Sequence, residues 1–255
     1  MKAMVVAAFV VTHPLWAWTV LAPGVVGWST KTLTIYVSTE GCQRDSDSLV
    51  ALIDRALAVW NSVPTSRLHL QREVITDTIS PAAFLGLTVT KLPVIFCDSS
   101  FSADLQTDGN VIPAASWVPA SSNTEITYGG IFLNVESGKD ANINHVTDGQ
   151  LELILAHEFG HVLGLGHSSL NRSLMYYSVA DKTQAVLTQD DTDGVSFLYP
   201  RNEIVLGPLG CASVHRPVAP AAGKVAGFWM LMAVVAWVSL LRGVGYLVSG
   251  GQYWP

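Results

Sequence analysis

Three histidines, His157, His161 and His167, lie within a segment of eleven residues, and Glu158 and Gly164 complete an H-E-x-x-H-x-x-G-x-x-H pattern. Residues four apart on a helix share a face, so the first two imidazoles are expected to project side by side. Gly164 can adopt the left-handed conformation that ends a helix and turns the chain back, which brings His167 toward them. Three histidine nitrogens bind one Zn²⁺ and leave the fourth position of a tetrahedral site to water, as in catalytic zinc sites.

The chemistry that this pattern predicts is hydrolysis of a peptide bond. Zinc lowers the pKa of a bound water to about 7 and polarises the scissile carbonyl. Glu158 is displaced around the helix from the ligands, so we expect it to reach the water rather than the metal. There it acts as general base and passes the proton to the departing amine. The alternative is a zinc-binding or adhesion module without activity, which the presence of Glu158 disfavours.

Two predicted helices frame this segment. Thr147 and Gln150 form a capping box at the start of a helix that runs to about Leu163 and carries the first two ligands. A second cap at Thr188 begins a helix that ends before Pro200.

The residues before the zinc pattern predict a sheet and one further helix. Ser46 or Asp47 caps a helix whose apolar residues recur at helical spacing, namely Leu49, Ile53, Ala56, Leu57 and Trp60. Apolar or alternating segments predict five strands, at Leu33–Val37, Arg67–Val74, Leu87–Phe96, Ala114–Val118 and Gly130–Val135. A mixed sheet backed by a long helix, with helices after it, is an α+β or α/β layout.

The composition indicates an ordinary globular middle between two apolar ends. Of the 255 residues, 49% are hydrophobic and 13% charged, against about 25% charged in soluble domains. All 20 acidic residues lie between Glu40 and Glu203. These values exclude a disordered chain, a collagen-like fibre and a disulfide-dense miniprotein. The net charge of −6 argues against nucleic acid as a partner.

The N-terminal end resembles an export signal in composition. A lysine precedes the apolar run Met4–Val11, which has the length of a signal-peptide core. Small residues at Ala22 and Gly24 predict a signal peptide over residues 1–24 with cleavage near Gly24, and cleavage after Ala17 is the second choice. An uncleaved anchor or a buried strand is the alternative.

The C-terminal end is apolar as well. Residues 201–224 contain the Pro-, Ala- and Gly-rich stretch Pro208–Gly223, which is typical of a spacer. Residues 225–248 are apolar apart from Arg242, which can snorkel to lipid headgroups. We expect a membrane anchor or a C-terminal sorting segment here; the alternatives are a buried core helix and a membrane protein whose function resides in this helix. The two ends together predict an exported protein, extracellular or at the cell surface and membrane-anchored.

Three cysteines in an exported protein leave at least one unpaired. Cys42 follows the first predicted strand and Cys97 ends the third, so two strand ends can bring them together as a disulfide in an oxidising compartment. Cys211 lies in the spacer, where it is free, lipidated or processed.

The zinc pattern is the metzincin signature, and the extended segment resembles the matrixin branch, the matrix-metalloproteinase-like zinc endopeptidases. Ser168 follows the third histidine as in matrixins, and the residues around Met175 resemble the Met-turn. The segment Leu187–Val195 with Leu198–Tyr199 resembles the closing helix of that domain. The resemblance covers residues 28–200 and implies a metzincin fold, a twisted five-stranded mixed sheet with three helices and an active-site cleft.

The resemblance also implies roles for residues around the metal. Met175 forms an apolar floor beneath the zinc, and Tyr176 and Tyr177 lie where the family builds the wall of its main specificity pocket. Tyr177 replaces the proline that is usual there. The edge strand Ala114–Val118 pairs with an extended protein or peptide substrate. Cys42 and Cys97 end neighbouring parallel strands, which favours the disulfide.

Other features of the family are expected to differ. No cysteine precedes Cys42 and no prodomain fits before Trp28, so cysteine-based latency is not expected. Members of the family use additional histidines to bind a second, structural zinc. Only His69 and His145 are available here, which is too few, and we interpret them as surface or strand residues. Calcium is a candidate cofactor at oxygen ligands of one turn, with a solvated turn as the alternative. The residues of that turn are Asp104, Asp108 and Asn110. Three other aspartates are interpreted as helix-cap and framework residues and are not expected to bind metal, namely Asp190, Asp191 and Asp193.

Overall fold

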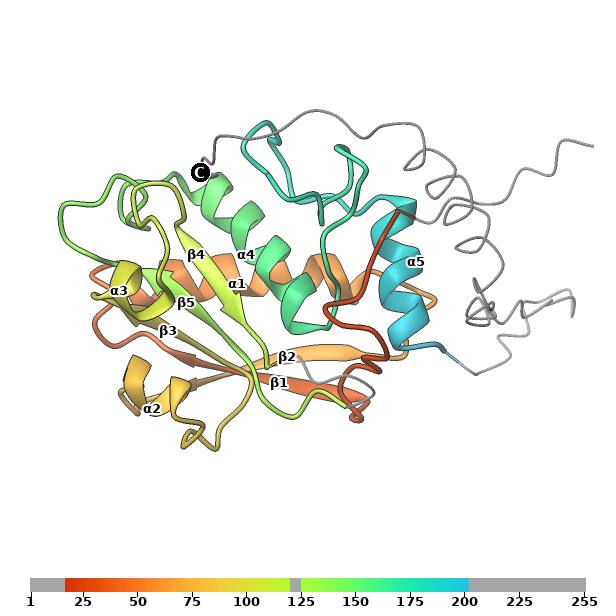
Figure 1. The fold of residues 1–255 in the computed structure, drawn as a ribbon, viewed down its shortest axis with the longest axis horizontal. Helices are drawn as coiled ribbons and strands as arrows, with labels where there is room; N and C mark the ends of the chain where they lie inside the picture. Colours follow the sequence, from red (N-terminus) through yellow and green to blue (C-terminus); the bar gives the residue numbers. More distant parts are fainter. Residues whose placement is uncertain (1–16, 120–124, 202–255) are drawn as a thin grey trace, which may run out of the picture. The chain divides into compact units, whose positions relative to one another are not determined.

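The computed structural model describes residues 17–119 and 125–201, which form a five-stranded sheet with helices on both faces (Figure 1). The predictions for the signal-peptide core, the spacer, Cys211 and the segment 225–248 lie outside these residues. Within the described ranges, no helix has the length and apolar character needed to cross a membrane. The elements are β1 (Thr32–Ser38), α1 (Ser46–Asn61), β2 (His69–Ile75), α2 (Pro81–Leu85), β3 (Val94–Asp98), α3 (Phe101–Leu105), β4 (Ala114–Trp117), β5 (Gly130–Asn134), α4 (Asp148–Val162) and α5 (Gln189–Leu198).

The sheet has the order β2-β1-β3-β5-β4. Four strands run parallel, and β4 pairs antiparallel with β5, with Ala115 opposite Phe132. The sheet is therefore mixed, as predicted. Among the described residues, β4 pairs with β5 alone, so it is an edge strand of this sheet, and it lies next to α4.

One face of the sheet is covered by α1 and α4, which contribute to the main hydrophobic core (Figure 1). Alternation places Leu33, Ile35 and Val37 of β1 in this core. The two helices are joined by a hydrogen bond that Trp60 Nε1 donates to the carbonyl of Ala156 at 2.8 Å. Because α4 packs along α1, the ligand-bearing helix is fixed against the sheet.

The opposite face has a smaller core made of aromatic rings, with Phe84 of α2 packed among the others. The short helices α2 and α3 on this side add to the three helices that the sequence predicted. The predicted strand over 87–96 is also wrong at its start, because β3 begins at Val94. Pro93 has no N–H to give to a sheet ladder, so pairing starts after it. The buried rings are those of Phe84, Phe96, Phe101 and Phe132.

Cys42 and Cys97 form a disulfide that spans 55 residues of sequence. A crosslink of this span removes conformational entropy from the unfolded chain. We expect that the double substitution Cys42→Ser and Cys97→Ser lowers the free energy of unfolding by about 3 kcal/mol, measured by urea denaturation. Cys211→Ser is the matched control and is expected to leave stability unchanged. A double variant as stable as the parent contradicts the prediction.

Asp98, beside this disulfide, is a buried carboxylate with 1% exposure. Its Oδ1 accepts the N–H of Ser100 at 2.7 Å, whereas its Oδ2 has no hydrogen-bond partner among the described residues. Burial first, and then the nearby carboxylates of Asp104 and Glu136, raise the pKa of Asp98 from 3.8 to about 6. The folded protein therefore holds a proton here more tightly than the unfolded chain does.

This raised pKa predicts a loss of stability as the pH rises from about 4 through 6, because the native state must then ionise a buried acid. Asp98→Asn removes the charge and is expected to raise the free energy of unfolding at pH 7.5 by about 2 kcal/mol. The gain shrinks toward zero at pH 4. Denaturant titrations at both pH values measure it, with the exposed Asp181→Asn as control. An equal effect at the two pH values contradicts the assignment.

Candidate metal centre

Helix α4 carries the first two histidines of the pattern. It begins at the predicted capping box, in which Thr147 and Gln150 bond reciprocally. Nine of its residues are buried, including His157 and His161. The Nε2 atoms of these two histidines lie 3.1 Å apart, so the sequence spacing of four does place both rings on one face.

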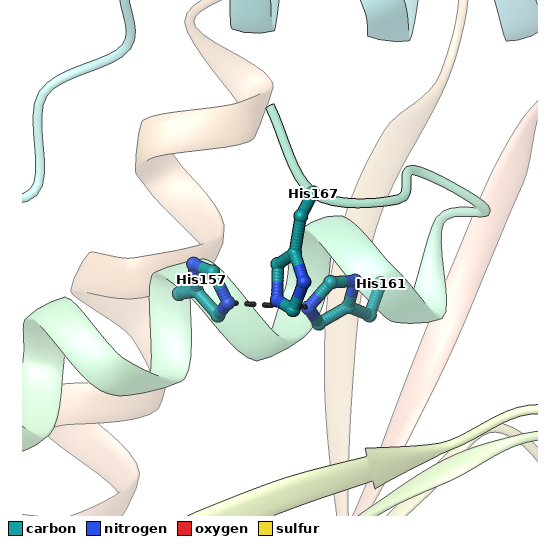
Figure 2. A group of neighbouring side chains, drawn as sticks. All are labelled: His157, His161 and His167. Carbon is teal, nitrogen blue, oxygen red and sulfur yellow. Dashed lines mark hydrogen bonds between the residues drawn. The ribbon is translucent and has the colours of Figure 1, made fainter. Parts of the chain in front are cut away.

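Gly164 ends this helix and redirects the chain. Its φ of +104° lies in the region that favours glycine, and the N–H of Leu165 donates to the carbonyl of Gly160 at 2.9 Å across the turn. The turn brings His167 back over the helix, with its Nε2 atom 3.2 Å from that of His161. Figure 2 shows the three rings pointing toward one another from the helix and from the loop after it.

The remaining ring nitrogens are held by backbone carbonyls. His157 Nδ1 lies 2.7 Å from the carbonyl of Leu174, and His161 Nδ1 lies 2.8 Å from that of Leu165. Since a carbonyl only accepts, both Nδ1 atoms carry the proton, and each neutral ring then has a lone pair on Nε2. Two lone pairs that face each other at this distance repel, and a cation between them would relieve that repulsion.

The spacing fits zinc. Two nitrogens about 2.05 Å from one tetrahedral ion are about 3.3 Å apart, and the two measured Nε2 separations are close to this value. All three ligand atoms lie within 4.8 Å of one another. Among the residues that the structure describes, this is the one group of three or more His, Cys, Asp or Glu side chains close enough to hold an ion.

The electrostatics of the cluster keep the rings of His161 and His167 neutral near pH 7. Burial first, and then the neighbouring His157, lower the pKa of His161 to about 3. Burial and His157 also lower the pKa of His167. Neutral imidazole is the form that binds metals, so His161 and His167 are already in that form near neutral pH.

Glu158 lies beside the histidines and is bonded to the edge strand. Its Oε2 accepts the N–H of Ser116 in β4 at 2.7 Å. Burial raises the pKa of Glu158, while His157 and the hydrogen bonding from Ser116 act in the opposite direction. This bond joins strand β4 to the helix that carries His157 and His161 through the side chain of Glu158.

Met175 is buried against the ligand helix. A Cβ added at Gly160 would lie 2.1 Å from Met175 Sδ, so only glycine permits this contact. Met175 was predicted to support the site, whereas Gly160 was not predicted, and its position directly before His161 was the available signal. The carbonyl of Met175 also accepts the N–H of Ser168 at 2.7 Å, which joins the Met-turn to the loop of the third ligand.

The other residues singled out in the sequence lie as follows. The rings of Tyr176 and Tyr177 are 4.3 Å apart between centroids, and Tyr177 is 68% exposed. The Asp108 carboxylate accepts the N–H and side-chain amide of Asn110, so the proposed calcium turn bonds to itself. His69 begins β2, and His145 Nδ1 contacts the carbonyl of Lys139.

Sequence reasoning missed two sets of contacts around the centre. Asp191 was predicted to be a framework residue, and its bonds to the Met-turn were not predicted. Residues 17–21, which lie within the predicted signal peptide 1–24, hydrogen-bond to the loop of His167, and no role at the centre was predicted for them. Neither set is adjacent in sequence to the histidines it supports.

Among the described residues, a helix and the loop after it bring three histidines together beside a carboxylate, an arrangement that fits one zinc ion. The family model described as "Matrixin" matches residues 27–200, and the chain belongs to this family.

Several relatives resemble parts of the chain. Metalloendoproteinase 2-MMP of Arabidopsis thaliana is 47% identical over 53 residues, which is 20% of this chain and 14% of the relative. Neutrophil collagenase of Homo sapiens is 41% identical over 73 residues, 28% of this chain and 15% of the relative. Stromelysin-1 of Mus musculus is 47% identical over 116 residues, 43% of this chain and 23% of the relative. Each match thus spans less than a quarter of the relative's length.

Proposed function

We propose that this protein is a zinc-dependent endopeptidase that hydrolyses peptide bonds in proteins. The observation that carries the proposal is the convergence of three Nε2 atoms within 4.8 Å, with two of the rings oriented by carbonyls and Glu158 alongside. His157, His161 and His167 are the proposed ligands. Membership of the matrixin family supports the same activity and metal.

A zinc ion in this site would supply Lewis acidity, which lowers the pKa of a water molecule and polarises the scissile carbonyl. The chain's own residues do the rest. Glu158 takes a proton from the attacking water and returns it to the departing amine, as a general base and then a general acid. The bond from Ser116 holds one oxygen of this carboxylate, which fixes its orientation beside the ligands. Gly164 and Met175 support the site through the turn and the packing described above.

The proposed substrate is an extended segment of a protein. Among the described residues β4 pairs with β5 alone, and an extended peptide can add to the other edge of such a strand by backbone hydrogen bonds. Tyr176 and Tyr177 follow Met175 directly and are proposed as part of the specificity pocket. Their rings contact each other at a tilt of 47°, and Tyr177 stands where a proline is usual, so we predict a pocket wall that differs from that of other family members.

Removal of the metal is expected to abolish cleavage. The full chain, purified in detergent, is incubated with an unfolded protein with and without a zinc chelator, and fragments are counted by mass spectrometry. We expect at least about a 100-fold loss on chelation and recovery when Zn²⁺ is returned. An inactive zinc-binding or adhesion module would bind Zn²⁺ yet cut nothing under any condition. Undiminished cleavage by zinc-free protein contradicts the mechanism.

The remaining expectations stay predictions. Export to the extracellular space or cell surface depends on the N-terminal segment, and membrane attachment depends on residues 225–248, outside the described ranges. A calcium ion at Asp104, Asp108 and Asn110 likewise stays a prediction.

A further inference from the structure

The segment between α3 and β4 includes residues 108–112, which we call the 108–112 loop, and it leads directly into the edge strand (Figure 1). Two backbone carbonyls of this loop, those of Gly109 and Ile112, converge on the side-chain nitrogen of Asn134, the last residue of β5. Asn134 Nδ2 donates to them at 2.9 and 3.1 Å. One amide group at the end of an inner strand therefore holds the loop at two points.

The orientation of this amide follows from its partners. Both carbonyls can only accept, so the NH₂ group faces them and both of its hydrogens are used. Asn134 Oδ1 accepts the N–H of Glu136 at 3.0 Å, and the backbone N–H of Asn134 donates to the carbonyl of Pro113 at 2.9 Å. Asn134 is fully buried. It thus holds the residue directly before β4 as well as the loop.

Carbonyl oxygens that converge on one point are also common ligands of Ca²⁺, and the sequence predicts calcium in this turn. The oxygens present are already bonded to N–H donors. Asp108 Oδ1 accepts the N–H and the side-chain amide of Asn110, and Glu136 Oε2 accepts the N–H of Ser102 at 2.8 Å. Within the described ranges, no three acidic side chains lie close enough to share an ion. A neutral nitrogen therefore lies where the two carbonyls meet.

We infer that the side-chain amide of Asn134 takes the place of a cation in holding the 108–112 loop, so that this loop needs no calcium. Asn134 is then a positioning residue for the start of β4, the strand whose Ser116 binds Glu158. The inference depends on neither the zinc site nor peptide hydrolysis. It competes with the calcium prediction for the same turn, and the two interpretations differ in the response of the protein to Ca²⁺.

Exchange of the amide for a carboxylate gives a sharp test, because it replaces the donor group by oxygen at nearly constant shape. In Asn134→Asp, the new carboxylate faces the carbonyls of Gly109 and Ile112 without a hydrogen to share. Glu136 is close to the same point, since a Cβ at Gly109 would lie 3.3 Å from both Asn134 Nδ2 and Glu136 Oε2. Oxygens of four residues then surround a place that suits Ca²⁺, whereas Mg²⁺ demands a stricter octahedral geometry.

The melting temperature of the full chain, purified in detergent with Zn²⁺ present, is measured in calcium-depleted buffer. It is measured again with about 10 mM Ca²⁺ or Mg²⁺, which exceeds the dissociation constants of weak calcium sites. The parent is expected to change by less than about 1 °C. Asn134→Asp is expected to melt about 10 °C below the parent without calcium. It is expected to regain at least about 5 °C with Ca²⁺ but not with Mg²⁺.

Asn61→Asp is the matched control. Asn61 Nδ2 donates to the carbonyl of Leu70 at 2.8 Å, and its Oδ1 accepts the N–H of the same residue at 2.7 Å. This variant also loses a donor to a backbone carbonyl, so it is expected to melt below the parent. Its side chain faces a single carbonyl, so Ca²⁺ is expected to restore none of the loss.

Hydrogen exchange of the parent adds a test that needs no variant. Mass spectrometry follows the peptides over residues 106–117 with and without Ca²⁺, and equal protection is expected. Greater protection there with Ca²⁺ overturns the inference, and so does a melting temperature that Ca²⁺ raises in the parent but not in Asp108→Asn. An Asn134→Asp protein that is as stable as the parent without calcium, or that Ca²⁺ does not restore, overturns it as well. Zinc content of the same preparations tests the proposed metal centre separately.

Discussion

Replacing Glu158 with glutamine is expected to lower kcat/KM on an unfolded protein about 1,000-fold, since a positioned general base contributes on the order of 10²–10⁴. The amide keeps the shape of the side chain and still offers an oxygen to the N–H of Ser116. It cannot take a proton from water. The histidine cluster is untouched, so zinc content is expected to stay at the parent level.

Two measurements make this prediction specific. Zinc content by elemental analysis shows that the variant keeps its metal, and fragment counting gives the rate. Glu152→Gln is the matched control, because Glu152 lies on the same helix but pairs at the surface with Arg55. The control is expected to cleave within about twofold of the parent. A Glu158→Gln variant that cleaves as fast as this control refutes the role of the base.

Short sequence patterns predicted those helices that are determined by residues near each other in the sequence. Capping residues marked the starts of α4 and α5, and helical spacing of apolar residues marked α1. The helix α2 carried a comparable signal that was not used, since Ser80 caps it and Pro81 opens it. The helix α3 has no side-chain cap, and its position follows from burial of Phe101 against the sheet.

The same distinction applies to the metal centre. The three ligands, the glycine turn and Glu158 fall within eleven residues, so one helical period and one turn suffice to bring them together. The groups that orient the ligands come from far away in the sequence. The carbonyl that holds His157 belongs to Leu174, and the bonds to the carbonyl and neighbours of His167 come from residues 17–21. No periodicity links such positions, so they appear only when the chain is folded.

Asp191 is the clearest of these distant supports. It is fully buried, and its carboxylate accepts the N–H groups of Leu174 and Met175, each at 2.9 Å. It also accepts Ser173 Oγ and both the N–H and the hydroxyl of Thr188. The same residue whose N–H it holds, Leu174, offers its carbonyl to His157 Nδ1. Asp191 therefore connects the start of α5, the Met-turn and a metal ligand.

Asp191→Ala is consequently expected to lower the free energy of unfolding by about 4 kcal/mol, because several buried donors lose a charged acceptor at once. Urea denaturation of the zinc-free protein measures the loss, and chelator competition is expected to show weaker zinc binding as the carbonyl of Leu174 loosens. Asp193→Ala is the control on the same helix, since Asp193 bonds only Gln189 in an exposed contact, and a change within about 0.5 kcal/mol is expected. If the two alanine variants unfold at the same urea concentration, Asp191 does not hold the Met-turn. If Asp191→Ala lowers the free energy of unfolding but leaves zinc affinity at the parent value, Asp191 stabilises the fold without affecting zinc binding. In that case the Met-turn does not transmit the loss to the metal site.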